Sequence, residues 1–178
     1  KYNVRIIRIC LGRCKARRRF GSHKEMRCAR AALTNMANES EYLSVSQIRI
    51  AIVDDHQFFR EGLRKYIELE EDMRVVAECD NGADALLAVR TETPDILLLD
   101  VNLPNMNGLQ ITRLVKADFP QVGIIVLTAY HDGEQVLHAM RSGAAAYCPK
   151  DITPDRLIEI IREVNEGYFV VGDERMTS

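Results

Sequence analysis

Short apolar runs alternate with amphipathic stretches between residues 48 and 167. The runs have the length of buried strands and cover residues 48–53, 74–79, 95–99, 123–127 and 144–148. After each run, apolar side chains recur at the spacing of one helix face, as Phe59, Leu63 and Ile67 do after the first. Turn and capping residues separate the elements: Asp80-Asn81-Gly82, Pro94, Pro120, Ser142-Gly143, Thr153-Pro154 and Gly167. The pattern predicts five strands that alternate with five helices.

The alternation of strands and helices determines the fold class. Crossovers between parallel strands are right-handed and helical, so helices cover both faces of the sheet. We therefore predict an α/β fold, a doubly wound five-stranded parallel sheet. Cys79 and Cys148 lie within strand patterns and are interpreted as reduced core residues. Sheets of this kind bind ligands at the carboxyl ends of their strands.

Polar side chains follow four of the predicted strands. Asp54 and Asp55 come after the first, Asp100 after the third, Thr128 after the fourth and Lys150 after the fifth. Because the carboxyl ends of parallel strands lie along one edge, these side chains converge there. Three carboxylates in one place repel one another unless a cation lies between them, and oxygen ligands favour Mg²⁺. The sequence predicts a magnesium site at this edge.

The same residues are suited to phosphoryl transfer. The Asp100 carboxylate is a nucleophile for phosphorus, while Mg²⁺ and Lys150 neutralise the transferring oxygens and Thr128 donates a hydrogen bond. The chain contains neither a P-loop nor a dinucleotide-binding glycine motif, so a nucleotide is not the expected donor. Each residue alone has an ordinary structural explanation, such as helix capping or solvation at the surface. Their joint placement favours the chemical interpretation.

Four motifs, in this order and spacing, resemble those of the receiver (phosphoacceptor) domains of two-component response regulators. They are Asp54-Asp55-His56, the segment DVNLPNMNG from Asp100 to Gly108, Leu127-Thr128-Ala129, and Tyr147-Cys148-Pro149-Lys150-Asp151. The resemblance covers residues 48–167 and is greatest to the NarL/LuxR-type subfamily. It implies a flavodoxin-like (CheY-like) sheet with strand order 2-1-3-4-5. The sequence departs from the family at one position: Asp151 follows Lys150, whereas many receivers have a proline directly after this lysine.

The resemblance implies a metal site and a site of phosphorylation. Asp100 is the implied phosphorylated aspartate, and Mg²⁺ is the implied cofactor. Asp55 would bind Mg²⁺ directly, Asp54 would act mainly through a coordinated water, and the main-chain carbonyl of Asn102 would be a further ligand beside Asp100.

The resemblance also implies roles around the phosphoryl group. Thr128 would hydrogen-bond a phosphoryl oxygen, and Lys150 would form an ion pair with it. Tyr147 would be the aromatic switch residue that reports phosphorylation to the surface. Asn102 and Tyr130 border the path of the hydrolytic water, and neither is an acid or base suited to activating water near neutral pH. We therefore expect a slowly decaying phosphoaspartate that the Tyr130 ring shields.

A sensor histidine kinase is the implied phosphoryl donor, with a small phosphodonor as a substitute. Phosphorylation is expected to favour a homodimer or release of an output domain through a switch surface that includes Val136, Met140, Tyr147 and Ile161. The output would be transcription, with DNA contacted only through a DNA-binding domain absent from this chain. We expect a cytoplasmic protein with no membrane partner, and no enzyme beyond catalysis of its own phosphorylation and dephosphorylation.

Two other functions fit parts of the pattern. A receiver-like module that only binds proteins would keep the fold without phosphorylation, although such modules usually lose part of the acidic set. A Mg²⁺-dependent aspartyl-phosphate hydrolase of the haloacid dehalogenase type would also use a strand-end aspartate. It needs a second aspartate two residues later as general acid, and that position is Asn102.

Charge divides the chain into two parts. Residues 1–35 carry a net charge of +10 and residues 36–178 a net charge of −12. We assign residues 1–47 to a basic leader, disordered or non-native, with Met36 as the natural start. A transit peptide and a nucleic-acid-binding arm are alternatives for this segment. A further alternative is a zinc site formed by Cys10, Cys14, His23 and Cys28.

Composition is consistent with one globular core in the remainder of the chain. Hydrophobic residues make up 47% and charged residues 28% of the 178 residues, which excludes disordered and collagen-like classes. The longest aliphatic runs are far shorter than the roughly 20 residues of a membrane-spanning helix. We expect the receiver domain at residues 48–167 and the start of a linker at residues 168–178, with no output domain present.

Overall fold

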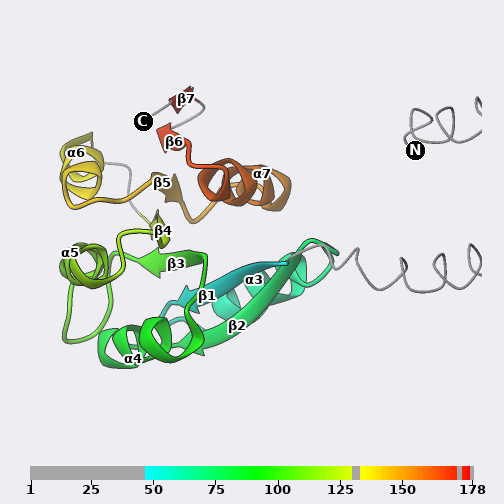
Figure 1. The fold of residues 1–178 in the computed structure, drawn as a ribbon, viewed down its shortest axis with the longest axis horizontal. Coiled ribbons are helices and arrows are strands. Elements are labelled where there is room, and N and C mark those ends of the chain that lie inside the picture. Colours follow the sequence, from blue (N-terminus) through cyan, green and yellow to red (C-terminus); the bar gives the residue numbers. More distant parts are fainter. Residues whose placement is uncertain (1–46, 130–132, 172–173, 177–178) are drawn as a thin grey trace, which may run out of the picture. The chain divides into compact units, whose positions relative to one another are not determined.

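The computed structural model describes residues 47–129, 133–171 and 174–176. Residues 1–46, which include nearly all of the predicted leader and its four zinc-ligand candidates, lie outside the described residues, so those hypotheses stay predictions. The described elements are β1 (Ile48–Val53), α3 (Gln57–Ile67), β2 (Met73–Cys79), α4 (Gly82–Glu92), β3 (Ile96–Asp100), α5 (Gly108–Asp118), β4 (Gly123–Thr128), α6 (Gly133–Arg141), β5 (Ala146–Pro149), α7 (Pro154–Asn165), β6 (Phe169–Val171) and β7 (Glu174–Met176) (Figure 1). None of the described helices has the length and apolar character needed to cross a membrane.

The strands form one sheet in the order β2-β1-β3-β4-β5-β6-β7. Strands β1 to β6 all pair in parallel with their neighbours, and β7 pairs antiparallel with β6. The α/β class and the order 2-1-3-4-5 of the first five strands are confirmed. The sheet is wider than predicted, because two strands of three residues each lie in the segment that we assigned to a linker. A run as short as Phe169–Val171 carries no readable periodicity, and its pairing depends on the exposed edge of β5.

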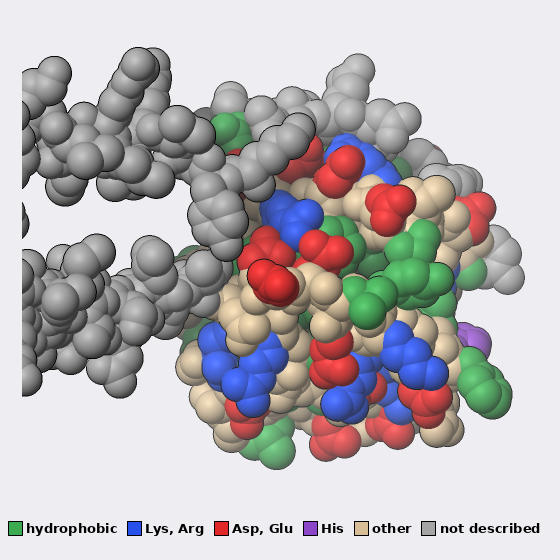
Figure 2. All heavy atoms as spheres, turned by 90° about the vertical axis from the view of Figure 1, so that its right-hand side faces the viewer, with side chains coloured by type: hydrophobic (Ala, Val, Ile, Leu, Met, Phe, Trp, Pro, Cys, Tyr) green, Lys and Arg blue, Asp and Glu red, His purple; other side chains and the backbone are tan. Residues whose placement is uncertain are grey.

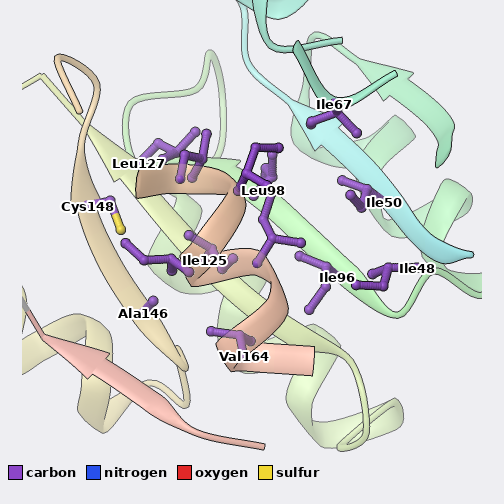
Figure 3. Close-up of a cluster of buried hydrophobic side chains, with 14 of the residues drawn as sticks. Ile48, Ile50, Ile67, Ile96, Leu98, Ile125, Leu127, Ala146, Cys148 and Val164 are labelled. Atoms are coloured by element: carbon purple, nitrogen blue, oxygen red, sulfur yellow. The ribbon is translucent and has the colours of Figure 1, made fainter. Parts of the chain in front are cut away.

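Alternating side chains of the strands supply two cores, one on each face of the sheet. Helices α3 and α7 cover one face, where Ile50, Leu98 and Ile125 are fully buried. Figure 3 shows these side chains together with Val164 of α7. Helices α4, α5 and α6 cover the other face, over Ala51, Leu97, Leu99, Ile124 and Val126. The strands are packed between these two layers, and their carboxyl ends carry the polar residues of the predicted site.

The two faces separate residues that we had grouped on one switch surface. Tyr147 is buried in the core that α4, α5 and α6 cover, and the partly buried Val136 packs against the same core. Ile161 lies in the opposite core and is fully buried. The placement of Ile161 on the switch surface is therefore wrong. Helical spacing marked Ile161 as apolar, but did not indicate that its side of α7 faces the sheet.

Ion pairs join elements at the end of the sheet where β1 begins. Arg162 of α7 donates to Asp72 at 2.8 Å and to Glu70 at 2.6 Å, which ties α7 to the turn between α3 and β2. The hydrogen bond from Arg162 holds the pKa of Asp72 below its usual range. Figure 2 shows this side of the molecule, where acidic and basic side chains are interspersed. The predicted site lies at the other ends of the strands.

Candidate functional site

Asp54 follows β1 and is completely buried. Its main-chain N–H donates to the Cys79 carbonyl of β2 at 3.1 Å. Its main-chain oxygen accepts a hydrogen bond from the Arg60 guanidinium of α3. These contacts fix Asp54 in place at the edge of the sheet, with its carboxylate directed toward the neighbouring strand ends.

Asp100 is the last residue of β3 and is 1% exposed. The N–H of Asn102 donates to its Oδ1 atom at 3.2 Å. The loop that follows returns closely to the strand, because the N–H of Gly108 donates to the Val101 carbonyl at 2.9 Å. A Cβ atom at Gly108 would collide with the main-chain oxygen of Asp100. Glycine at this position is therefore a steric requirement of the Asp100 geometry.

Lys150 connects the two buried carboxylates. Its Nζ atom lies 2.7 Å from Oδ2 of Asp100 and 2.8 Å from Oδ2 of Asp54. On α3, the ring of Phe59 lies beneath the ammonium, 5.1 Å from it to the ring centroid. The main-chain N–H of Lys150 donates to the Thr128 carbonyl at 2.7 Å, which holds the lysine against β4. Lys150 therefore contacts Asp100 even though the residue after it is Asp151 and not the proline found in many receivers.

Burial and pairing act in opposite directions on the two central groups. Burial raises the pKa of Asp100 above its usual value, and the hydrogen bond from Lys150 offsets this only in part. Burial alone would lower the pKa of Lys150, but the two carboxylates outweigh it and the pKa is raised. Lys150 is therefore a permanent cation at neutral pH. Asp100 is a carboxylate whose charge is costly in this position.

Asp55 and His56 complete the cluster on the solvent side. Nδ1 of His56 lies 2.7 Å from Oδ1 of Asp55 and 3.2 Å from Oδ1 of Asp54. Ligand atoms of these residues and Asp100 all lie within 4.8 Å of one another. Three carboxylates so close together repel, and oxygen donors of this kind fit a hard divalent cation. The arrangement has the donor set of the predicted magnesium site.

The remaining predicted site residues occupy different environments. Thr128 is fully buried at the end of β4, and Asn102 is exposed. Tyr147 is buried, and its hydroxyl donates to Oε1 of Gln135 across a long distance of 3.4 Å. Tyr130 lies outside the described residues, so its predicted shielding role stays a prediction. The structure thus brings Asp54, Asp55, Asp100 and Lys150 together, with Thr128 hydrogen-bonded to Lys150 through the main chain.

Two contacts of this site were not predicted. The residues Phe59 and Arg60 lie on α3, one turn after the acidic pair, and reach back to Lys150 and Asp54. In the sequence, Phe59 has the spacing of a core residue and Arg60 has that of a solvated one. The only signal was their position immediately after a strand end that carries the acids.

Comparison with known proteins gives the family. Residues 50–162 match the model of the response regulator receiver domain. The chain belongs to this family. The chain is 36% identical over 128 residues to the transcriptional regulatory protein DegU of Brevibacillus brevis, which covers 72% of this chain and 54% of that protein. The prediction of a receiver domain is therefore confirmed.

Solved structures support the same assignment. A two-component response regulator of the LuxR family from Aurantimonas sp. SI85-9A1 matches with a TM-score of 0.68 and 32% identity, over 72% of this chain and 91% of that one. The BeF3-activated receiver domain of DrrB matches with a TM-score of 0.61 and 29% identity, over 67% of this chain and 98% of that one. The relatives are NarL/LuxR-type response regulators, and the chain spans about half the length of the DegU relative. Receiver domains bind Mg²⁺ through an aspartate cluster, and this receiver has such a cluster in Asp54, Asp55 and Asp100.

Proposed function

We propose that this receiver domain accepts a phosphoryl group on Asp100 from a sensor histidine kinase. The observation that carries the proposal is the contact of the buried Asp100 carboxylate with Lys150, beside the acidic pair at the end of β1. An aspartate in the same place for structural reasons alone would be destabilising, because burial raises its pKa. The arrangement is costly for the fold and useful for the reaction.

The reaction is an in-line transfer between two nucleophiles. An oxygen of Asp100 attacks the phosphorus of a phosphohistidine, a P–O bond forms and the P–N bond breaks. The imidazole of the kinase leaves with the electron pair and takes up a proton. Lys150 stays protonated throughout, because its raised pKa keeps it charged at neutral pH, and it neutralises a phosphoryl oxygen. Thr128 donates its hydroxyl to another oxygen from the end of β4.

The acidic residues hold the divalent cation in this proposal. Asp55 and Asp100 would hold Mg²⁺ with their carboxylates and Asn102 with its main-chain carbonyl, and Asp54 would act on the ion mainly through water. When bound, Mg²⁺ supplies positive charge to the oxygens of the transferring phosphoryl group. Asp55 and Asn102 are exposed at the mouth of the cluster, so they are accessible to the ion and to its remaining waters.

The reaction leaves a phosphoryl group on Asp100, and we propose that this modification controls transcription. Phosphoryl contacts with Thr128 and Lys150 would rearrange β4 and β5, and Tyr147 of β5 would change its packing under α6. We infer that this favours a homodimer or frees a DNA-binding output domain in the cytoplasm. Light scattering with and without beryllofluoride measures the first effect. Equal masses at high protein concentration would remove the homodimer from the proposal.

Binding of beryllofluoride tests the phosphoacceptor site without a kinase. The anion mimics a phosphoryl group on aspartate, and ¹⁹F NMR detects it directly. We expect binding to the wild-type chain with Mg²⁺, and none after chelation or in Asp100→Asn. Absence of binding to the wild type would favour a module that only binds proteins. Steady hydrolysis of small phosphate esters would favour the hydrolase alternative.

A further inference from the structure

The side chain of Arg60 connects the acidic loop to two other elements. Arg60 is on α3 and is only 16% exposed, which is unusual for arginine outside a pairing network. One arm, Nη1, donates to the main-chain oxygen of Asp54. The Nε atom lies 4.0 Å from Oε2 of Glu78 on β2. The guanidinium therefore lies between the end of β1 and the neighbouring strand.

The bond from Arg60 is made at the peptide that joins the two aspartates. The carbonyl of Asp54 and the N–H of Asp55 belong to one rigid plane, so fixing that carbonyl fixes the direction in which Asp55 leaves the strand. Asp54 itself is also held by Cys79 through its N–H and by Lys150 through its carboxylate. Asp55 has a side chain that is 38% exposed. His56 contacts the Asp55 carboxylate itself, with Nδ1 2.7 Å from Oδ1, whereas Arg60 holds the main-chain carbonyl of the peptide that precedes Asp55.

We infer that Arg60 is a positioning residue for the magnesium site, which acts by orienting the Asp54–Asp55 peptide. The inference rests on the proposed function, because it concerns the same metal site. A positioned peptide lets Asp55 meet the ion without losing backbone freedom on binding, so the anchor raises the affinity for Mg²⁺. Partners that orient metal ligands commonly change metal affinity by tenfold or more.

The direction of the change in Mg²⁺ affinity distinguishes a positioning role of Arg60 from an effect of its charge. A cation close to the cluster repels Mg²⁺, so removal of the guanidinium charge alone would increase affinity. Loss of the anchor decreases it. A lysine at position 60 keeps the charge but has a single nitrogen, which cannot serve the Asp54 carbonyl and Glu78 in the fork geometry of arginine. We therefore expect a decrease of about tenfold in Arg60→Gln and a smaller decrease in Arg60→Lys.

Arg64 provides a matched control. It lies one turn further along α3 and pairs with the same Glu78 at 2.8 Å. Its other ion-pair partner is Glu68, which is not part of the acidic cluster. Arg64→Gln removes the same charge from the same helix and weakens the same ion-pair network. The positioning role predicts that its Mg²⁺ affinity stays within twofold of wild type.

Calorimetric titration of Mg²⁺ into the full chain and the three variants tests the inference. Thermal unfolding in chelator shows how far each substitution destabilises the fold, and Arg60→Lys keeps the test valid if Arg60→Gln does not fold. Weaker binding in both Arg60 variants and unchanged binding in Arg64→Gln support the positioning role. Equal or tighter binding in the Arg60 variants overturns it and leaves the proposed function intact. Failure of the wild-type chain to bind Mg²⁺ overturns both.

Discussion

The ammonium of Lys150 lies 2.7 Å from a carboxylate oxygen of Asp100, although the two residues are fifty positions apart in the chain. The contact arises because β3, β4 and β5 are adjacent and parallel, so their carboxyl ends coincide. A second carboxylate, from Asp54, lies 2.8 Å from the same ammonium. One lysine therefore compensates two almost fully buried acids, and the stability of the domain without metal depends on it.

Substitution Lys150→Met should lower the free energy of unfolding by about 3 kcal/mol in metal-free buffer at neutral pH, since it leaves two buried carboxylates without a cation. Urea denaturation measures this. Lys65→Met, at an exposed position of α3, is the control and should change stability by less than about 0.5 kcal/mol. Added Mg²⁺ should restore part of the loss in Lys150→Met. Equal effects of the two substitutions would contradict the dependence on Lys150.

Asp100→Asn should stabilise the metal-free domain at neutral pH. Burial raises the pKa of Asp100 in the folded state, so the folded protein binds its proton more tightly than the unfolded chain does. The contribution of this group to stability is then fully present below the ordinary pKa of aspartate and is lost as the pH rises through the folded pKa. Asp100→Asn should therefore become more stable than the wild type as the pH rises from the ordinary pKa of aspartate through the raised pKa of Asp100, and it should remain more stable at neutral pH. Unfolding curves at several pH values check this, and a variant less stable than wild type at pH 7 would show that the pairing with Lys150 outweighs burial.

Gly108→Ala should damage the site from the loop after β3. Its methyl group would collide with the Asp100 carbonyl, so the strand end or the loop must move. We expect a loss of about 1–3 kcal/mol in stability and weaker beryllofluoride binding. Gly62→Ala is the matched control, because no atom lies near the added carbon and alanine favours a helix by up to about 1 kcal/mol. If both variants bind the anion like wild type, the close approach at Gly108 is not what positions Asp100.

Tyr130→Ala should shorten the lifetime of the phosphorylated state. The prediction comes from sequence alone, as the ring at this position is expected to shield the phosphoryl group from water. The decay of phosphoprotein after removal of the donor measures it, with Tyr66→Ala on the remote part of α3 as control. A Tyr130→Ala variant that decays at the wild-type rate or slower would show that another feature sets the lifetime.

The sequence predicted most of the framework because the relevant signals are local. Apolar runs, helix spacing and the glycine or proline that ends each element are readable one segment at a time, and the parallel topology then brings Asp54, Asp100 and Lys150 to one edge. Signals that depend on other segments were missed. Phe169–Val171 becomes a strand only because the edge of β5 is available, and Ile161 was placed on the wrong side of α7. The contact of Arg60 with the site has no sequence signature, since it is made to a main-chain oxygen.

The site of phosphorylation provides the most direct test of the proposed function. The chain would be treated with acetyl phosphate and Mg²⁺, reduced with borohydride, which converts an aspartyl phosphate to homoserine, and mapped by peptide mass spectrometry. Conversion at Asp100 alone, dependent on Mg²⁺ and absent from Asp100→Asn, is the predicted result. Conversion at another aspartate, or labelling that survives in Asp100→Asn, would contradict the account.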